Sequence, residues 1–563
     1  MAEQITRVYS SFRGVDFRGE EINLLRSPDA LNVWKDYKNT ERIETRPGMK
    51  LHMNLSDDVH GIFFYKGEML VHCGNKLYKR VGYTNEVLYD GLNNARSNGF
   101  IYDNIFYLMD GAHYLKYDGQ TVGNVVGYIP TTTIARKPMG GGTTYQDVNM
   151  LSPYRKNSFL ADGVSCSYFL DVMNIDRDYM PEVTVNDEAV ESSEFEVDFA
   201  EGRIMFLNTP PDPPLTAGQD NVVIQFKKSV PKYRECIEKC TLLQVFDNRV
   251  FFSGNPDHPN MVWNSSLNDP TYVGDLDYYK EGMDDAAVKG LVAGNNALWV
   301  FREPSDANTT VFYHTPASYT VGLTDNVRKA YPSIHSSITT GCVGAAVNFN
   351  DDIVFFSERG MEGISGDVTT EQAVAHRSSL VDRKMTAEAK YKDMVVVEWK
   401  GYLLVFIGDK VYLADSRSMF QNENHYEYEW FYWQIEYNIK CATVKDGILY
   451  LGTSAGVYTL EDTNANVKSY WVTPLDKFKN PNRLKTTNKR GCIGEATGDI
   501  SVYAKLEDTD FELIGTYSGV KDYFVCRIKR KKFKDLQLKF YSPTRFSLET
   551  VTLECFVGGY IKR

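Results

Sequence analysis

The sequence predicts a mainly β protein: a β-propeller of about seven blades, with a small inserted β-sandwich and a C-terminal β-sandwich domain. Three observations predict this fold class: a composition that favours strands, a turn-and-strand unit that recurs along the chain, and a tail of alternating strands. The chain has 563 residues, of which 43% are hydrophobic and 24% charged, as is ordinary for a packed chain. Its 37 Tyr and 30 Phe favour strands, because flat rings pack well on a pleated, half-buried surface.

The composition also argues against several classes of protein. The nine cysteines are an odd number and are scattered mostly singly through apolar strand patterns, which indicates buried thiols of a reducing cytoplasm and not a disulfide framework. The start, Met1–Ile5, has no secretory signal, and no run of about 18 apolar residues predicts a membrane-spanning helix or anchor. The formal charge of −12 argues against a surface that grips nucleic acid by counter-charge.

The recurring unit is a polar turn, three or four apolar residues, a second turn, and an aromatic or β-branched strand. One example runs from Lys400-Gly401 through 403–406 and Gly408-Asp409 to 411–413. The first turns of seven such units lie at 67, 104, 248, 295, 351, 401 and 447, so the gaps are 37, 144, 47, 56, 50 and 46 residues. Five of these six gaps are close to the length of a four-stranded propeller blade. The alternative is a plain antiparallel sandwich, which also has short strands between turns.

The gap of 144 residues locates an insertion between the second and third units. Strands are expected there at 183–186, 195–199, 203–206 and 222–226, with a hairpin turn at Glu201-Gly202. These strands predict a small β-sandwich that is inserted into one blade. The glycines at 140–142 lack the Lys and Ser/Thr of a phosphate-binding loop, so a flexible hinge is the preferred interpretation.

After residue 465 the repeat ends, and four segments alternate with the period of half-buried strands, at 499–504, 522–526, 536–540 and 549–556. They predict the separate C-terminal sandwich. The expected organisation is therefore an N-terminal arm with propeller-closing strands (1–60), the first propeller blades (61–130), the inserted β domain (131–230), the remaining blades (231–465) and the C-terminal β-sandwich (466–563).

Charge is distributed unevenly along the chain. From residue 466 to the end there are 19 Lys and Arg against 11 Asp and Glu, a formal charge of +8, so the preceding part carries −20. The densest basic run is Lys529, Arg530, Lys531 and Lys532. We interpret this run as a docking site for an acidic partner; a nucleic-acid contact, or a solvated strand edge that discourages strand pairing, is the alternative.

The sequence contains few candidate catalytic or ligand-binding residues, and no enzyme, cofactor or metal site is expected. A P-loop, a zincin helix, a nucleophile elbow and an EF-hand loop are all missing. The weak candidates are better explained as turns, core or solvated surface. They are Cys236 with Cys240, Asp257-His258, the glycines 360, 363 and 366, the pairs Asp57-Asp58 and Asp284-Asp285, and the aromatic stretch 426–433, which would otherwise be a sugar-stacking platform.

Three stretches resemble a known family. They are 25–32 with 43–48, then 253–257 with 259–260, Trp263 and 267–272, and the ending Glu554–Tyr560. Together they resemble bacteriophage packaged-DNA stabilisation proteins, which are similar to the tail hub or nozzle subunits of short-tailed phages. The resemblance spans most of the chain, and its motifs are turn and strand signatures.

This resemblance implies a non-catalytic structural protein of the virion tail, assembled in the host cytoplasm. It implies a homo-oligomeric six-fold ring at the head–tail connection, below the portal and connector (adaptor) proteins. Such a ring continues the DNA channel, retains packaged DNA until ejection, and carries tail fibres, spikes or a plug. Double-stranded DNA would pass through transiently without tight binding.

The charge distribution leads to a hypothesis about this ring. Because an acidic wall repels DNA, we expect carboxylates of the propeller to face the channel while the basic C-terminal sandwich docks an acidic neighbouring ring. Two rival functions remain: a host-surface glycan-binding adhesin, and a propeller-fold glycan-degrading enzyme of the tail.

Overall fold

In this computed structural model, residues 3–19, 22–306, 309–320, 327–366, 368–369, 373–422, 425–528 and 532–561 are described. They form strands almost throughout, with two short helices, α1 (Tyr233–Glu238) and α2 (Asp382–Met385), and one 3₁₀ turn (Tyr391–Asp393). Neither helix approaches the length and apolarity that a membrane crossing requires. All nine cysteines are free, and seven are buried, as the sequence predicts.

Seven four-stranded antiparallel sheets recur along the chain, and they are the blades of a β-propeller. This confirms the predicted fold class. The described residues divide into two compact units.

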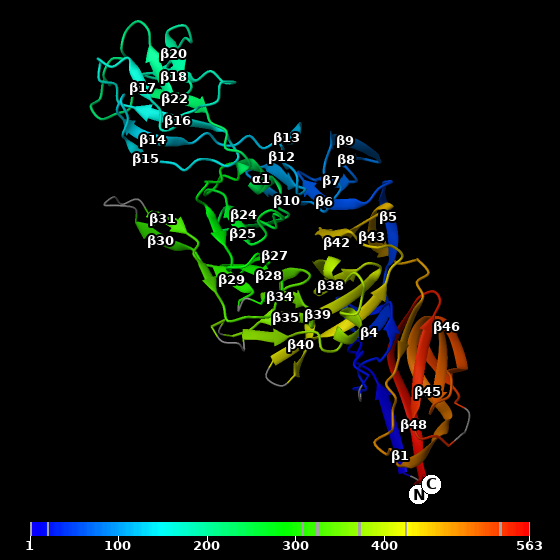
Figure 1. Cartoon of the computed structure of the whole chain (residues 1–563). Coiled ribbons are helices and arrows are strands. Elements are labelled where there is room, and N and C mark those ends of the chain that lie inside the picture. The colour runs from blue at the N-terminus through cyan, green and yellow to red at the C-terminus, as the bar shows by residue number, and fades with distance from the viewer. Residues whose placement is uncertain are drawn as a thin grey trace. The chain divides into compact units, whose positions relative to one another are not determined.

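The first unit comprises 1–87, 308–311 and 336–563. It holds four blades, most of whose strands are drawn in blue and yellow in Figure 1. They are β6 (Val59–Tyr65), β7 (Glu68–Cys73), β8 (Lys76–Val81) and β9 (Thr84–Asp90); β33 (Ala346–Phe349), β34 (Asp352–Ser357), β35 (Gly360–Ile364) and β36 (Val374–His376); β37 (Val395–Trp399), β38 (Tyr402–Ile407), β39 (Lys410–Asn422) and β40 (His425–Gln434); and β41 (Cys441–Lys445), β42 (Ile448–Thr453) and β43 (Gly456–Asp462) with β5 (Gly48–Asn54).

The second unit comprises 88–307 and 312–335. It holds the inserted domain, three blades and a two-stranded hairpin. The blades are β10 (Asn98–Tyr102), β11 (Ile105–Met109), β12 (Tyr114–Tyr117) and β13 (Val122–Asn124); β23 (Leu242–Phe246), β24 (Arg249–Ser253), β25 (Met261–Asn264) and β26 (Tyr278–Lys280); and β27 (Val288–Gly294), β28 (Ala297–Arg302), β29 (Val311–His314) and β32 (Ser333–His335), while the hairpin is β30 (Ala317–Thr320) with β31 (Val327–Ala330).

The first turn of every blade has the backbone that a tight hairpin requires. In each of the seven, both central residues have positive φ, as in Asp446 (52°) with Gly447 (78°) and Asn295 (52°) with Asn296 (57°). Two consecutive positive φ values define the turn whose twist matches that of antiparallel strands, and Asn, Asp and Gly adopt them at the lowest cost. These turns are the ones from which the sequence predicts the blades.

The first strands of successive blades contact one another within each unit. In the first unit β37 contacts β41, and β41 contacts β6; in the second unit β10 contacts β23, and β23 contacts β27. Apolar side chains form shared cores between neighbouring blades, from first strands, as Val59 with Cys441, and from second strands, as Phe251 with Leu298. A single sheet could not bury both of its faces in this way.

The first 60 residues of the chain divide between two sheets. Strand β5 pairs with β43 and completes a blade whose other strands lie some 400 residues later, at 441–462. The strands before it join the C-terminal sandwich: β1 (Glu3–Tyr9) pairs with β48 (Phe546–Tyr560), β2 (Ala30–Leu31) with β44 (Ser469–Val472), and β4 (Asn39–Thr45) with both β3 (Val33–Asp36) and β48. Figure 1 shows β1 and β48 side by side.

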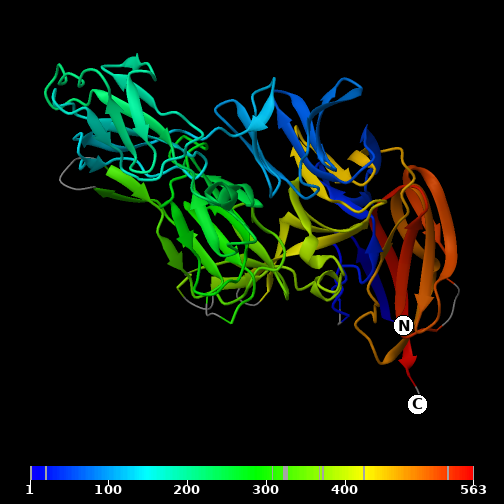
Figure 2. The same cartoon turned by 45° about the horizontal axis from the view of Figure 1, so that its top comes forward.

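The C-terminal sandwich is one sheet folded over itself. Its long strands are β45 (Arg483–Leu506), β46 (Glu512–Cys526) and β48, and β47 (Leu536–Ser542) completes it. Part of β45 (483–498) pairs with β48 and part (501–506) with β47, so β45 passes through both layers. The strand β46 bends back on itself. A Cβ added to Gly515 would lie 2.6 Å from Cys526 Sγ, whereas these two residues of β46 would be about 36 Å apart if the strand were straight. The bend lies beside the Gly498–Gly519 pair, next to a register shift, and Figure 2 shows the curved ribbon in orange and red.

The inserted domain is a smaller sandwich with its own core, which includes Phe159, Tyr168, Ile204 and Ile224. The predicted strands all form. The six-stranded layer holds β14 (Thr131–Arg136), β15 (Thr143–Thr144), β16 (Tyr154–Phe159), β18 (Glu182–Val185), β19 (Glu188–Val190) and β22 (Val222–Lys227), and the three-stranded layer holds β17 (Ser167–Phe169), β20 (Phe195–Asp198) and β21 (Arg203–Phe206).

The segment between β1 and β5 packs tightly on the outer strand β40. Val15 N donates to Trp430 O at 2.7 Å, and Arg26 forms two 2.8 Å hydrogen bonds with Glu429. Trp34 stacks on Trp399 with ring centroids 5.5 Å apart. The C-terminal sandwich is therefore joined to this blade through a buried aromatic core.

Candidate functional site

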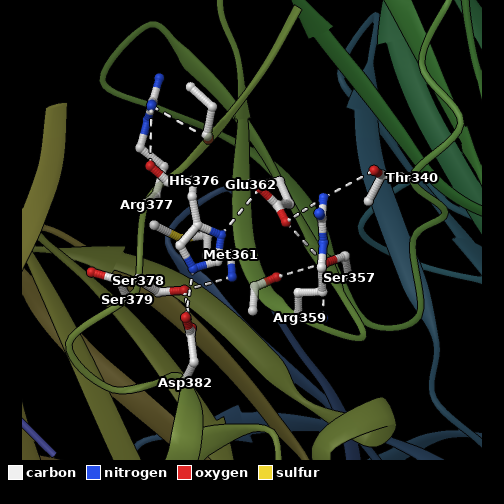
Figure 3. A network of polar contacts seen from close by, with 12 residues as sticks. Thr340, Ser357, Arg359, Met361, Glu362, His376, Arg377, Ser378, Ser379 and Asp382 are labelled. Carbon is white, nitrogen blue, oxygen red and sulfur yellow. Dashed lines mark hydrogen bonds and ion pairs between the residues drawn. The ribbon is translucent and has the colours of Figure 1, made fainter. Parts of the chain in front are cut away.

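A network of charged side chains lies at the end of one blade (Figure 3). His376, the last residue of β36, lies between two carboxylates. Its Nδ1 is 3.2 Å from Oε2 of Glu362 on β35, and its Nε2 is 2.5 Å from Oδ2 of Asp382 on α2. The glutamate is buried, and the other two side chains are mostly buried.

These contacts fix the charge of His376. Burial lowers the pKa of the imidazole, but the hydrogen bonds and negative charges of Asp382 and Glu362 outweigh burial and raise that pKa to about 10. At neutral pH the ring is therefore a cation that donates from both nitrogens.

The surrounding groups occupy the carboxylate oxygens as well. Ser378 Oγ donates to Asp382 Oδ1 at 2.5 Å, while Arg359 lies 3.2 Å from Glu362 Oε1. A general base needs a free lone pair, and a nucleophile needs a base to activate it. The cationic histidine has no free lone pair, so it can neither act as a base nor activate a nucleophile. We therefore interpret Glu362, His376 and Asp382 as an ionic clamp that fastens α2 to β35 and β36.

A buried ion pair lies next to this clamp. Arg377 Nε donates to Asp352 Oδ2 at 2.9 Å, and the hydroxyl of Tyr428 donates to the same oxygen at 2.9 Å. A Cβ on Gly363 would lie 2.7 Å from Arg377 Nε, so this glycine makes room for the guanidinium. The glycines at 360, 363 and 366 are therefore strand and turn residues, as the sequence analysis preferred.

The other weak candidates are also explained by local structure. Burial raises the pKa of both Cys236 and Cys240, and no group of three or more His, Cys, Asp or Glu in the described ranges could hold a metal ion. Each remaining pair has a charged partner or a structural contact. Asp257 bonds Lys239 at 2.8 Å, His258 packs its ring against Trp263, Asp58 lies 3.0 Å from Lys440, and Asp284 pairs with Arg302.

The aromatic strand belongs to the core. Tyr428, Trp430, Phe431, Tyr432 and Trp433 of β40 are all buried. Their rings pack against Phe349, Trp34 and Tyr402 and are not available to stack on a sugar.

The predicted docking run follows β46. Lys529, Arg530 and Lys531 lie outside the described residues, and Lys532 is exposed. The connection continues through Phe533, which is buried and bridges to Lys485, and Lys534, whose amide donates to Glu507 Oε1 at 2.9 Å. The nearest described core residues on either side of 529–531, Ile528 and Phe533, are both buried.

Sequence reasoning missed two features. The ionic clamp joins residues of two strands and a helix that have no motif spacing. The other is the strand just before the basic run, β46, which pairs with β45 and with no other strand of the described chain. Its period-two pattern was visible over 522–526, but the bare outer edge follows from the topology alone.

Comparison with known proteins yields no family. No family model matches the chain, and no curated protein matches it. Solved structures with some similarity include BamB from Moraxella catarrhalis (8% identity, 77% of this chain and 92% of that one, TM-score 0.34) and apo AztD from Citrobacter koseri (8% identity, 96% and 100%, TM-score 0.28). The computationally designed Ika8 protein has 11% identity over 73% of this chain and 98% of its own, with a TM-score of 0.31.

Proposed function

We propose that this chain is a structural virion protein, a subunit of a phage tail hub or nozzle ring below the portal and connector. In this role it continues the DNA channel, retains packaged DNA and anchors tail appendages such as fibres, spikes or a plug. It catalyses no reaction and needs no cofactor there. It is assembled in the host cytoplasm and carried in the virion tail.

One observation carries the proposal: a basic module is built onto an acidic propeller through buried contacts. Residues 466–563 carry a formal charge of +8 and form the C-terminal sandwich together with β1–β4, while residues 1–465 as a whole carry −20. A subunit that must dock a neighbour and yet release DNA needs both kinds of surface, because basic groups attract acidic partners and carboxylates repel phosphate.

The placement of the propeller's carboxylates refines the channel hypothesis. The first strands of the seven blades hold a single carboxylate, Glu398, which is exposed; these strands are β6, β10, β23, β27, β33, β37 and β41. Acids lie instead on blade turns, such as Asp103, Asp351 and Asp446. We therefore expect repulsion of DNA to come from turns at the blade ends and not from the strands themselves.

The two rival functions have less support. An enzyme would need a histidine or carboxylate free to exchange a proton, whereas His376 is held between two carboxylates. A glycan-binding adhesin would need exposed rings, whereas the aromatic strand β40 is buried.

The test is electron microscopy of the purified chain and of the virion. We expect closed rings, with the chain located on the tail axis below the portal. Sedimentation velocity on the same sample gives the number of copies. A chain that is absent from the tail axis, or that hydrolyses a host glycan, would refute the proposed function.

A further inference from the structure

The outer edge of β46 is an unusually long, open strand edge. The strand covers Glu512–Cys526, 15 residues, and its inner edge pairs with β45 from Cys492 to Ala504. Among the residues that the structure describes, no strand pairs with its outer edge. Because β46 bends with β45, this edge runs along both layers of the sandwich.

This edge carries apolar side chains into solvent. Val520 is 89% exposed, Tyr523 68%, Leu513 56% and Val525 55%. Proteins normally protect a sheet edge with a short strand, a proline or inward-pointing charges, because a bare edge pairs with other chains. β46 is long and has no proline, and Lys521 and Asp522 are its charged residues between Leu513 and Cys526.

A pocket lies where β46 begins. It has a volume of about 240 Å³ and is lined by Leu506, Leu513, Ile514 and Ile528, with Glu512 and Arg527 among its polar residues. A pocket beside a strand edge is the arrangement by which added strands are recognised: the backbone supplies affinity and a pocket selects one side chain.

Charge favours another copy of the same chain as the occupant. The sandwich segment that carries β46 has a formal charge of +8, and the exposed Arg527 and Lys532 follow the strand. Residues 1–465 of any other copy carry −20. A contact between two different surfaces of identical chains can close into a ring.

We propose that the outer edge of β46 is the docking site for a second copy of this chain, which adds a strand to it. This inference rests on the proposed ring subunit and names the surface that joins neighbours. The exposed apolar side chains become covered in the ring, and the pocket at the start of the strand receives one side chain of the neighbour.

The test compares lysine variants of exposed valines. Val520→Lys, alone and with Tyr523→Lys, places charges on the edge, whereas Val164→Lys is the matched control, since Val164 is 80% exposed on the inserted domain. We expect each edge lysine to weaken self-association at least about tenfold in sedimentation velocity. The control should assemble like wild type, and unchanged circular dichroism would show that all variants fold.

Hydrogen exchange supplies an independent measurement. Amides in 512–526 should gain protection when wild-type protein assembles, and the double variant should not show this gain. Rings that form normally in the double variant, or assembly without protection of β46, would overturn the proposal. A double variant that forms normal rings but no longer binds another tail protein would also overturn the proposal, because that protein would then be the one that docks on β46.

The remaining outcomes separate this inference from the proposed function. If wild-type chains stay monomeric in solution but lie on the tail axis of the virion without strand pairing at β46, the ring subunit stands and the edge contact is refuted. If the chain is missing from the tail, both proposals fail.

Discussion

The blade β37–β40 and the C-terminal sandwich are built from the same kinds of strand, but they close in different ways. The blade is four successive antiparallel strands, and its outer strand accepts hydrogen bonds from the amides of Val15 and Asn32. The sandwich instead gathers strands from both ends of the chain, and no strand of the described ranges pairs with the outer edge of β46. Local pairing thus completes a blade, while distant pairing builds the sandwich.

The largest expected effect is a loss of stability caused by a substitution in the blade β33–β36. Arg377→Ala leaves the buried carboxylate of Asp352 without its partner and should lower the free energy of unfolding by about 3–5 kcal/mol. Arg359→Ala is the matched control from the neighbouring clamp. Its guanidinium is 67% exposed, so the loss should stay below about 1 kcal/mol. Urea denaturation followed by tryptophan fluorescence measures both, and equal losses would contradict the distinction.

The second prediction concerns the junction between blade and sandwich. Gly14 has φ of 110°, and an added Cβ would overlap the carbonyl oxygen of Trp430. Gly14→Ala should therefore cost about 3 kcal/mol, since strain and overlap add. Gly67→Ala, at φ of 83° with open space around it, should cost only about 1–2 kcal/mol. Thermal denaturation of the two variants tests this order.

A third prediction sharpens the role of the ionic clamp. Because the pKa of His376 is raised to about 10, its stabilising effect is full below pH 6.5 and is lost as the pH rises through 10. His376→Gln should be less stable than wild type by about 1–3 kcal/mol at pH 6. The difference should vanish near pH 10 in urea titrations. A difference that does not change with pH would mean that the histidine is not charged in the folded protein.

The smallest effect on stability is expected in the basic run. Lys529→Glu combined with Lys532→Glu should change the free energy of unfolding by less than about 0.5 kcal/mol. The same variant should associate more slowly with an acidic neighbouring ring, and the difference should shrink at high salt. Stopped-flow association with the isolated connector measures this rate. Unaltered kinetics would remove these lysines from the docking surface.

The sequence predicted the blades well because their signals are local. Each first turn sits between two short apolar strands, and pairs such as Asp103-Asn104 and Asp446-Gly447 adopt the positive φ that marks such hairpins. The inserted sandwich was equally visible, because an interruption of a regular repeat stands out.

Pairing between distant segments could not be predicted. No local pattern indicates that Arg7 pairs opposite Leu553, or that Trp34 stacks on Trp399. The clamp was hidden for the same reason, since Glu362, His376 and Asp382 come together only through the fold. That the basic run 529–532 is a docking site remains a prediction. The open edge of β46 could not be predicted, because it depends on which strands do not pair.

The pairing of β1 with β48 also sets the order of events during synthesis. β1 is synthesised before β48, and more than five hundred residues separate the two strands, which takes tens of seconds at roughly 5–20 residues per second. The β6–β9 blade can pair its strands long before then. The C-terminal sandwich therefore completes its pairing after this blade, because β1 must wait for β48.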